Sequence, residues 1–111
     1  MANASNVESD ACGAIFVALA DPTRRKLFET LTRGPRSVGD LAKTLPVSRP
    51  AVSQHLRHLS DAGLVQSTRK GTRNIYAARQ EGVEVLRRYL ETLWGDVLTA
   101  FADKIDQENL K

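Results

Sequence analysis

The chain has 111 residues, a length that predicts one domain spanning residues 1–111 with a modest core of its own. Its single cysteine, Cys12, excludes an intrachain disulfide and favours a cytoplasmic location, and no apolar run is long enough for a membrane span. Only 5% of the residues are aromatic, which argues against a stacking platform for single-stranded nucleic acid.

The N-terminal part of the chain predicts two helices. Residues 1–6 are polar and are expected to be loose, whereas apolar residues recur at helical spacing from Val7 to Ala20. The pair Asp21-Pro22 is typical of a helix start, because aspartate caps the first N–H groups and proline is tolerated in the first turn. The buried face of this second helix would consist of Leu27, Phe28 and Leu31.

Residues 37–63 predict two short helices separated by a tight break. Ser37 and Asp40 have the spacing of a helix-capping pair, Pro46 ends the first helix, and Ser48 can cap the second. The inward face of the second helix would consist of Val52, Leu56, Leu59 and Gly63. Its outward face would carry Pro50, Ser53, Gln54, Arg57, His58 and Asp61. Serine, glutamine and arginine read base edges or hold phosphates in other proteins, although any surface helix has a polar outer face.

Residues 64–78 predict a basic β-hairpin with its turn at Arg69-Lys70-Gly71-Thr72. Such a hairpin can follow a phosphate backbone, or its charge can simply discourage edge-to-edge pairing of strands. Residues 33–79 carry nine basic and two acidic side chains, whereas residues 80–111 carry four basic and seven acidic ones. The positive charge therefore lies on the two short helices and the hairpin, which suits a polyanionic partner.

Residues 81–108 predict one long helix with an apolar face wider than a small domain is expected to cover. Part of that face can pack on the chain's own core, but the excess indicates self-association. The candidate interface residues of this helix are Tyr89, Leu90, Leu93, Trp94, Val97, Leu98 and Phe101. A two-fold dimer would present its two copies of the second short helix to successive major grooves, about 34–36 Å apart, on a near-palindromic site.

The phrases ALADPTRRKLFETL, SVGDLAKTLPVSRPAVSQHLRHLSDAGLV and RKGTRNIYA resemble the ArsR-type winged helix-turn-helix transcriptional regulators. The resemblance runs from Phe16 to Tyr76. It implies a mainly α fold with a small β-hairpin, in the order α-α-α-α-β-β-α, with the hairpin as the wing. It also implies a homodimer joined through its first and last helices that binds double-stranded operator DNA and usually represses. The first helix would contribute Ile15 and Leu19 to that dimer.

The resemblance also implies which residues contact DNA. The groove and phosphate contacts carried over are Ser48, Arg49, Ser53, Gln54 and Arg57, and those of the wing are Arg69, Lys70, Thr72 and Arg73. Metal-sensing members have a Cys-x-Cys type motif in the helix that corresponds to residues 38–45, or Asp and His ligands in the last helix, and this chain has no cysteine or histidine in either place. A transition-metal site needs several such ligands, so we expect no metal and no cofactor.

Other functions find less support in the sequence. Ser53, His55 and Asp61 lie on one helix and cannot converge as a catalytic triad, so we expect no enzyme. A protein-interaction module that has lost DNA binding stays open as an alternative, as does a regulator that holds a small molecule near Trp94 and Phe101. We expect His55 to be a hydrogen-bonded structural residue, and an intersubunit disulfide at Cys12 also stays open.

Overall fold

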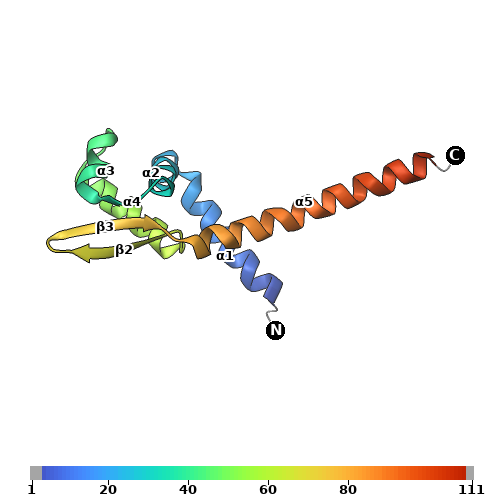
Figure 1. Cartoon of the computed structure of the whole chain (residues 1–111), viewed down its shortest axis with the longest axis horizontal. Helices are drawn as coiled ribbons and strands as arrows, with labels where there is room; N and C mark the ends of the chain where they lie inside the picture. Colours follow the sequence, from blue (N-terminus) through green and yellow to red (C-terminus); the bar gives the residue numbers. More distant parts are fainter. Residues whose placement is uncertain (1–3, 110–111) are drawn as a thin grey trace.

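The computed structural model describes residues 4–109, which form five helices and a small antiparallel sheet (Figure 1). The helices are α1 (Ala4–Ala20), α2 (Pro22–Thr32), α3 (Val38–Thr44), α4 (Arg49–Asp61) and α5 (Gln80–Asn109). The strands are β1 (Arg36–Ser37), β2 (Val65–Lys70) and β3 (Arg73–Ala78). This order confirms the predicted winged helix-turn-helix, with α3 and α4 as the helix pair and the β2–β3 hairpin as the wing.

The first helix begins earlier than the sequence predicted. Helix α1 includes residues 4–6, which were expected to be loose. Residues 1–3, for which the same was expected, lie outside the described part of the chain. Ala4 is a strong helix former, and neither proline nor glycine interrupts the chain between it and Val7. The helix also continues through Gly13 without a break.

The start of α2 is fixed by hydrogen bonds within the chain. The Asp21 carboxylate accepts the backbone N–H groups of Thr23 at 2.9 Å and Arg24 at 3.0 Å, and Pro22 occupies the first helical position, as predicted. The bond from the Arg24 N–H is the main reason that the pKa of Asp21 lies below its usual value. The Arg24 side chain turns back and donates from Nε to the Ala18 carbonyl at 2.8 Å, so it closes the end of α1.

The sheet contains one strand that the sequence did not predict. Strand β1 pairs antiparallel with β3, placing Arg36 opposite Tyr76 and Ser37 opposite Ile75, and the strand order is β1-β3-β2. A two-residue strand has no periodicity to detect, and both residues immediately precede a helix. The wing itself turns at Gly71, whose φ of +63° suits the tight connection between β2 and β3.

The core lies where α1, α2, α3 and α4 meet the base of the wing. Its almost fully buried side chains are Ile15, Leu27, Leu31, Leu41, Val52, Leu56, Leu59, Leu64 and Val65. Val52, Leu56 and Leu59 are all 0% exposed, as predicted for the inward face of α4, whereas Gly63 lies beyond the end of the helix and is only half-buried. Phe28 is only partly buried and packs against this core.

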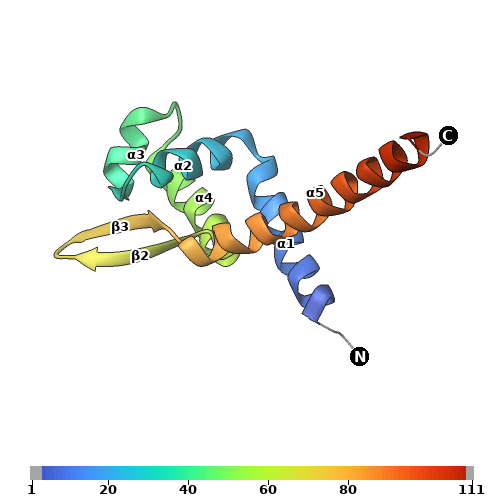
Figure 2. The same ribbon diagram turned by 45° about the vertical axis from the view of Figure 1, so that its right-hand side comes forward.

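Helix α5 follows the wing in the chain and begins beside the C-terminal end of α4. It then passes α1, and its distal half extends away from the other elements (Figure 1 and Figure 2). The molecule is therefore elongated, with extents of 69 × 35 × 20 Å. At the start of α5, Gly82 lies against the backbone of Gly63, and a Cβ atom at Gly82 would lie 3.0 Å from the Gly63 carbonyl carbon. Within residues 4–109, no helix combines the length and the apolar character that a membrane crossing requires.

Candidate nucleic-acid interface

Helix α4 presents the polar side chains that the sequence assigned to DNA. Ser48 caps it by accepting the Ala51 N–H at 3.3 Å, and the buried leucines and valine fix the rotation of the helix against the core. As a result Ser53, Gln54 and Arg57 are all exposed on the outer side. Glutamine and arginine reach base edges or phosphates when a helix lies in the major groove.

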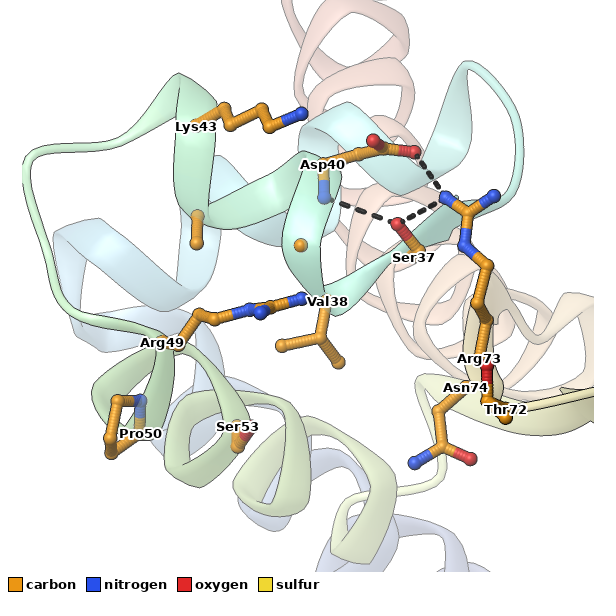
Figure 3. A pocket seen from close by; sticks show the side chains of 12 residues that line it. Ser37, Val38, Asp40, Lys43, Arg49, Pro50, Ser53, Thr72, Arg73 and Asn74 are labelled. Carbon is orange, nitrogen blue, oxygen red and sulfur yellow. Dashed lines mark hydrogen bonds and ion pairs between the residues drawn. The ribbon is translucent and has the colours of Figure 1, made fainter.

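An open groove of about 820 Å³ lies between α3, the start of α4 and the wing (Figure 3). Its basic lining residues are Lys43, Arg49 and Arg73, and Asp40 is the single acidic one among the described residues that line it. Ser53, Thr72 and Asn74 add neutral polar groups. We call this the cationic groove. Four of the nine predicted DNA contacts line it, namely Arg49, Ser53, Thr72 and Arg73.

The Arg49 side chain lies along the surface of α3. A Cβ atom at Gly39 would lie 2.6 Å from Nη2 of Arg49, so the guanidinium occupies the space that a side chain at position 39 would need. In Figure 3 Arg49 points across from α4 beneath α3, next to Val38. The absence of a side chain at Gly39 leaves room for this position of Arg49, which the sequence did not reveal because the two residues meet only in the folded chain.

Arg73 connects the wing to the start of α3. Its Nη2 donates to the Ser37 hydroxyl oxygen at 2.9 Å and lies 3.3 Å from Oδ2 of Asp40 (Figure 3). The same Ser37 oxygen accepts the Asp40 N–H at 3.1 Å, as expected for the helix cap. A hydrogen bond with Ser37, and then the charges of Arg73 and Lys43, lower the pKa of Asp40 despite some desolvation. Arg73 is thus already paired, whereas the sequence reading had assigned it only to DNA.

The tip of the wing carries the remaining predicted cations. Arg69 donates from Nε to the Gly71 carbonyl at 3.1 Å, which folds its side chain over the turn. Lys70 and Thr72 are exposed on either side of Gly71. The structure thus places these side chains at the far end of the hairpin, where they are accessible to a phosphate backbone.

The predicted interface residues of α5 form an exposed apolar face. Its members with at least two fifths of their surface exposed are Leu90, Leu93, Trp94, Val97, Leu98, Phe101 and Ile105. Part of this face, including Trp94, borders a shallow hollow of about 470 Å³ on the side of the helix. Phe16 of α1 is also exposed and stacks edge-on against Tyr89 with ring centroids 5.8 Å apart. The sequence reading had missed Phe16 and its exposed neighbour Val17.

The two interface residues predicted in α1 do not lie on the exposed apolar surface. Ile15 is 1% exposed and belongs to the chain's own core, so it offers no surface to a second copy, and Leu19 is partly buried against that core. The predicted helix is present, but its apolar residues face α5 and the core of the same chain. The side of α1 that carries Phe16 and Val17 is the exposed one.

Cys12 and His55 are both held inside the fold. Cys12 is 1% exposed, and its thiol points to the Val85 carbonyl with Sγ 3.6 Å from the oxygen, so the thiol is inaccessible to a partner's cysteine in this structure. His55 is half-buried, but its buried Nδ1 has no hydrogen-bond partner among the described residues, in contrast to the expectation. No group of three His, Cys, Asp or Glu side chains within that part of the chain is placed to hold a metal ion.

Comparisons with known proteins agree with this geometry. A family model described as a helix-turn-helix domain matches residues 19–68. The HTH-type transcriptional regulator Rv2034 of Mycobacterium tuberculosis is 50% identical over 91 residues, which are 82% of this chain and 85% of that protein. An ArsR-like transcriptional regulator from Rhodococcus sp. RHA1 has a similar structure, with a TM-score of 0.72 and 34% identity over 84% of this chain and 91% of that one.

A further solved structure is similar over nearly the same length. It is a homodimeric winged helix-turn-helix DNA-binding domain, Mb0332 of Mycobacterium bovis, described as a possible ArsR-family regulator. Its TM-score is 0.69 at 26% identity, and the match covers 88% of this chain and 91% of that one. The first two of these relatives are named transcriptional regulators, and the third is described as a possible one. By its elements, its sequence and its structural neighbours, the chain belongs to the ArsR-type winged helix-turn-helix transcriptional regulators.

Proposed function

We propose that the protein is a homodimeric, sequence-specific repressor that binds a near-palindromic operator in double-stranded DNA in the cytoplasm. The observation that carries this proposal is the cationic groove, which lies between the exposed face of α4 and the wing. A helix fits the major groove of B-form DNA, and a basic hairpin beside it can follow the adjacent phosphates. The groove thus offers positive charge where a phosphate backbone would pass.

The side chains divide into two roles by their chemistry. Gln54 and Ser53 would read base edges, because their amide and hydroxyl groups match the donors and acceptors of the major groove. The contacts to phosphates would come from Ser48, Arg49, Arg57, Arg69, Lys70 and Thr72. Phosphate contacts fix the register of the protein on the duplex and make the affinity salt-dependent, whereas base contacts provide the sequence preference.

A dimer would be built on the apolar face of α5 together with the exposed side of α1. Large apolar side chains in this number are rarely left in water on a monomer, and one structural neighbour is homodimeric. Two-fold symmetry would place the two α4 helices about 34–36 Å apart, which requires two half-sites one helical turn apart. A dimer bound across a promoter would block access of the transcription machinery. It would do so without a metal ion.

The proposal is tested by a salt-titrated binding assay with the DNA upstream of the protein's own gene and a scrambled duplex of equal length. We expect tight binding to the upstream fragment alone, with two protomers per site, and a linear fall of log affinity with log salt. Equal affinity for both fragments would contradict sequence-specific binding to this site. Absence of binding at low salt would contradict the proposal as a whole and favour a protein-interaction module.

Replacing Arg69 with alanine should weaken binding to every DNA sequence by a similar factor. The reason is that a phosphate contact carries no sequence information, and its loss should reduce the salt slope by about one. Arg69→Lys keeps the charge and should preserve the slope, and Arg25→Ala removes an exposed arginine from α2 as a control. A salt titration of all three variants against the wild type checks the prediction. An unchanged slope in Arg69→Ala would exclude the phosphate contact.

Replacing Gln54 with alanine should relax the sequence preference at one position of each half-site. A bidentate contact from glutamine to adenine discriminates by about 1–3 kcal/mol, so single-base variants at that position should become nearly equivalent. Gln66→Ala removes an exposed glutamine from β2 and should leave the preference unchanged. Competition binding with a set of singly substituted operators measures both variants. A Gln54→Ala protein with the wild-type preference would show that Gln54 does not read a base.

A further inference from the structure

The wing has only a short attachment to the helix-turn-helix unit. Strand β3 pairs with β1 at two positions, Tyr76 and Ile75, and beyond them the β2–β3 hairpin continues to its tip without a further strand beside it. A two-stranded hairpin has little stability by itself. Contacts beyond Ile75 therefore have a large influence on the angle at which the wing leaves the body.

Arg73 supplies such a contact, two residues beyond Ile75 towards the tip. It joins Ser37, which is 5% exposed, and Asp40 in the first turn of α3, so it binds the hairpin to a helix that is itself anchored in the core by Leu41. We call the residues Ser37, Asp40 and Arg73 the wing latch. In Figure 3 the latch closes one side of the cationic groove, opposite Arg49.

Within the latch, the positive charge of Arg73 lies next to the negative charge of Asp40. Within the part of the chain that the structure describes, Asp40 is the one acidic residue that lines the groove, and it lies 3.3 Å from the Arg73 guanidinium. Arg73 therefore donates directly to a carboxylate in the DNA-free protein, and the charge of Lys43 also acts on that carboxylate. By long-range electrostatics alone, an acid in a DNA-binding groove repels phosphate, and its removal should strengthen binding.

We propose that Asp40 and Arg73 are positioning residues for DNA binding: the latch sets the wing at the angle at which its tip and α4 engage one duplex together. Asp40 then strengthens DNA binding although it is negatively charged, and Arg73 acts through the wing rather than as a phosphate contact. This inference rests on the proposed function. In this proposal Arg73 has a positioning role in place of the phosphate contact that the resemblance implied.

The test compares Asp40→Ala, Arg73→Ala and the double variant in the salt-titrated operator assay. Each single variant should bind about three- to tenfold more weakly, and the double variant should be no weaker than either, because residues in one contact are not additive. Arg73→Ala should keep the wild-type salt slope. Asp61→Ala removes an exposed acid from the end of α4 without touching the latch, and should bind as tightly as wild type or more tightly. Tighter binding by Asp40→Ala, or a salt slope reduced by about one in Arg73→Ala, would overturn the proposal.

A second measurement needs no DNA. Amide hydrogen exchange of residues 69–76 should be faster in Asp40→Ala and Arg73→Ala than in the wild type and in Asp61→Ala, because the wing opens more often without the latch. Unchanged exchange in the latch variants would overturn the positioning role. If the wild-type protein bound no DNA, the proposed function would fail, and the exchange rates would still decide whether the latch holds the wing.

Discussion

A protein in which Trp94 and Val97 are both changed to glutamate is expected to be a monomer that has lost specific binding to its operator. Both side chains are more than half exposed in the single chain, at 65% and 54%, so the change should not disturb the chain's own core. In a dimer these positions would be buried, and two carboxylates per protomer would be costly to desolvate there. Linked binding to two half-sites would also be lost, which should reduce operator affinity about a hundredfold or more.

The control for this variant carries the same added charge on the other side of the same helix. Thr92 and Thr99 are exposed and lie on the face of α5 opposite Trp94, so changing both to glutamate should leave the dimer intact. Light scattering coupled to gel filtration gives the molar mass, circular dichroism gives the fold, and the operator assay gives the affinity. If the Trp94 and Val97 variant remained dimeric, the two protomers would meet through another surface.

Replacing Gly82 with alanine is expected to destabilise the protein by about 1–3 kcal/mol, the usual cost of forcing extra atoms into a packed site. The added Cβ would overlap the Gly63 carbonyl oxygen and lie 3.2 Å from the Leu64 Cα, and all of these neighbours are backbone atoms that cannot rotate away. The start of α5 would have to move away from the end of α4. Because α4 is the proposed DNA-reading helix and α5 the proposed dimer helix, the spacing of the two half-sites should change as well.

A second glycine of α5 provides the matched control. A Cβ atom at Gly95 would meet nothing within 4 Å, so Gly95→Ala should stabilise the helix by about 0.5–1 kcal/mol instead. Chemical denaturation measures the stability of both variants. A series of operators with altered half-site spacing measures whether the preferred spacing changes in Gly82→Ala. Equal stability of the two alanine variants would show that α4 and α5 separate without cost at this point.

Local signals in the sequence were sufficient to predict most of the fold. Asp21, Ser37 and Ser48 all cap helices where their side-chain oxygens and following residues had indicated a start. Strand-forming residues on both sides of the basic turn that contains Gly71 predicted the wing. These features depend on neighbours within a few residues, so the sequence contains them directly.

The features that were missed depend on residues that meet only after folding. Strand β1 exists because Ser37 lies beside Ile75, and Gly39 and Gly82 matter because of Arg49 and Gly63 respectively. The pattern of α1 was clear, but periodicity alone did not show which apolar residues face the same chain. The candidate DNA contacts were assigned largely by resemblance. The structure brings four of them into one groove and pairs Arg73 with an acid.

The position of Cys12 makes the chain's one thiol a reporter of motion between α1 and α5. Since the thiol is 1% exposed and faces the Val85 carbonyl of α5, a thiol-specific reagent can reach it only when the two helices part. The modification rate in native buffer would therefore measure the free energy of that local opening. If α1 and α5 form the dimer, the rate should fall as protein concentration rises, which would give the dimer dissociation constant without any introduced label.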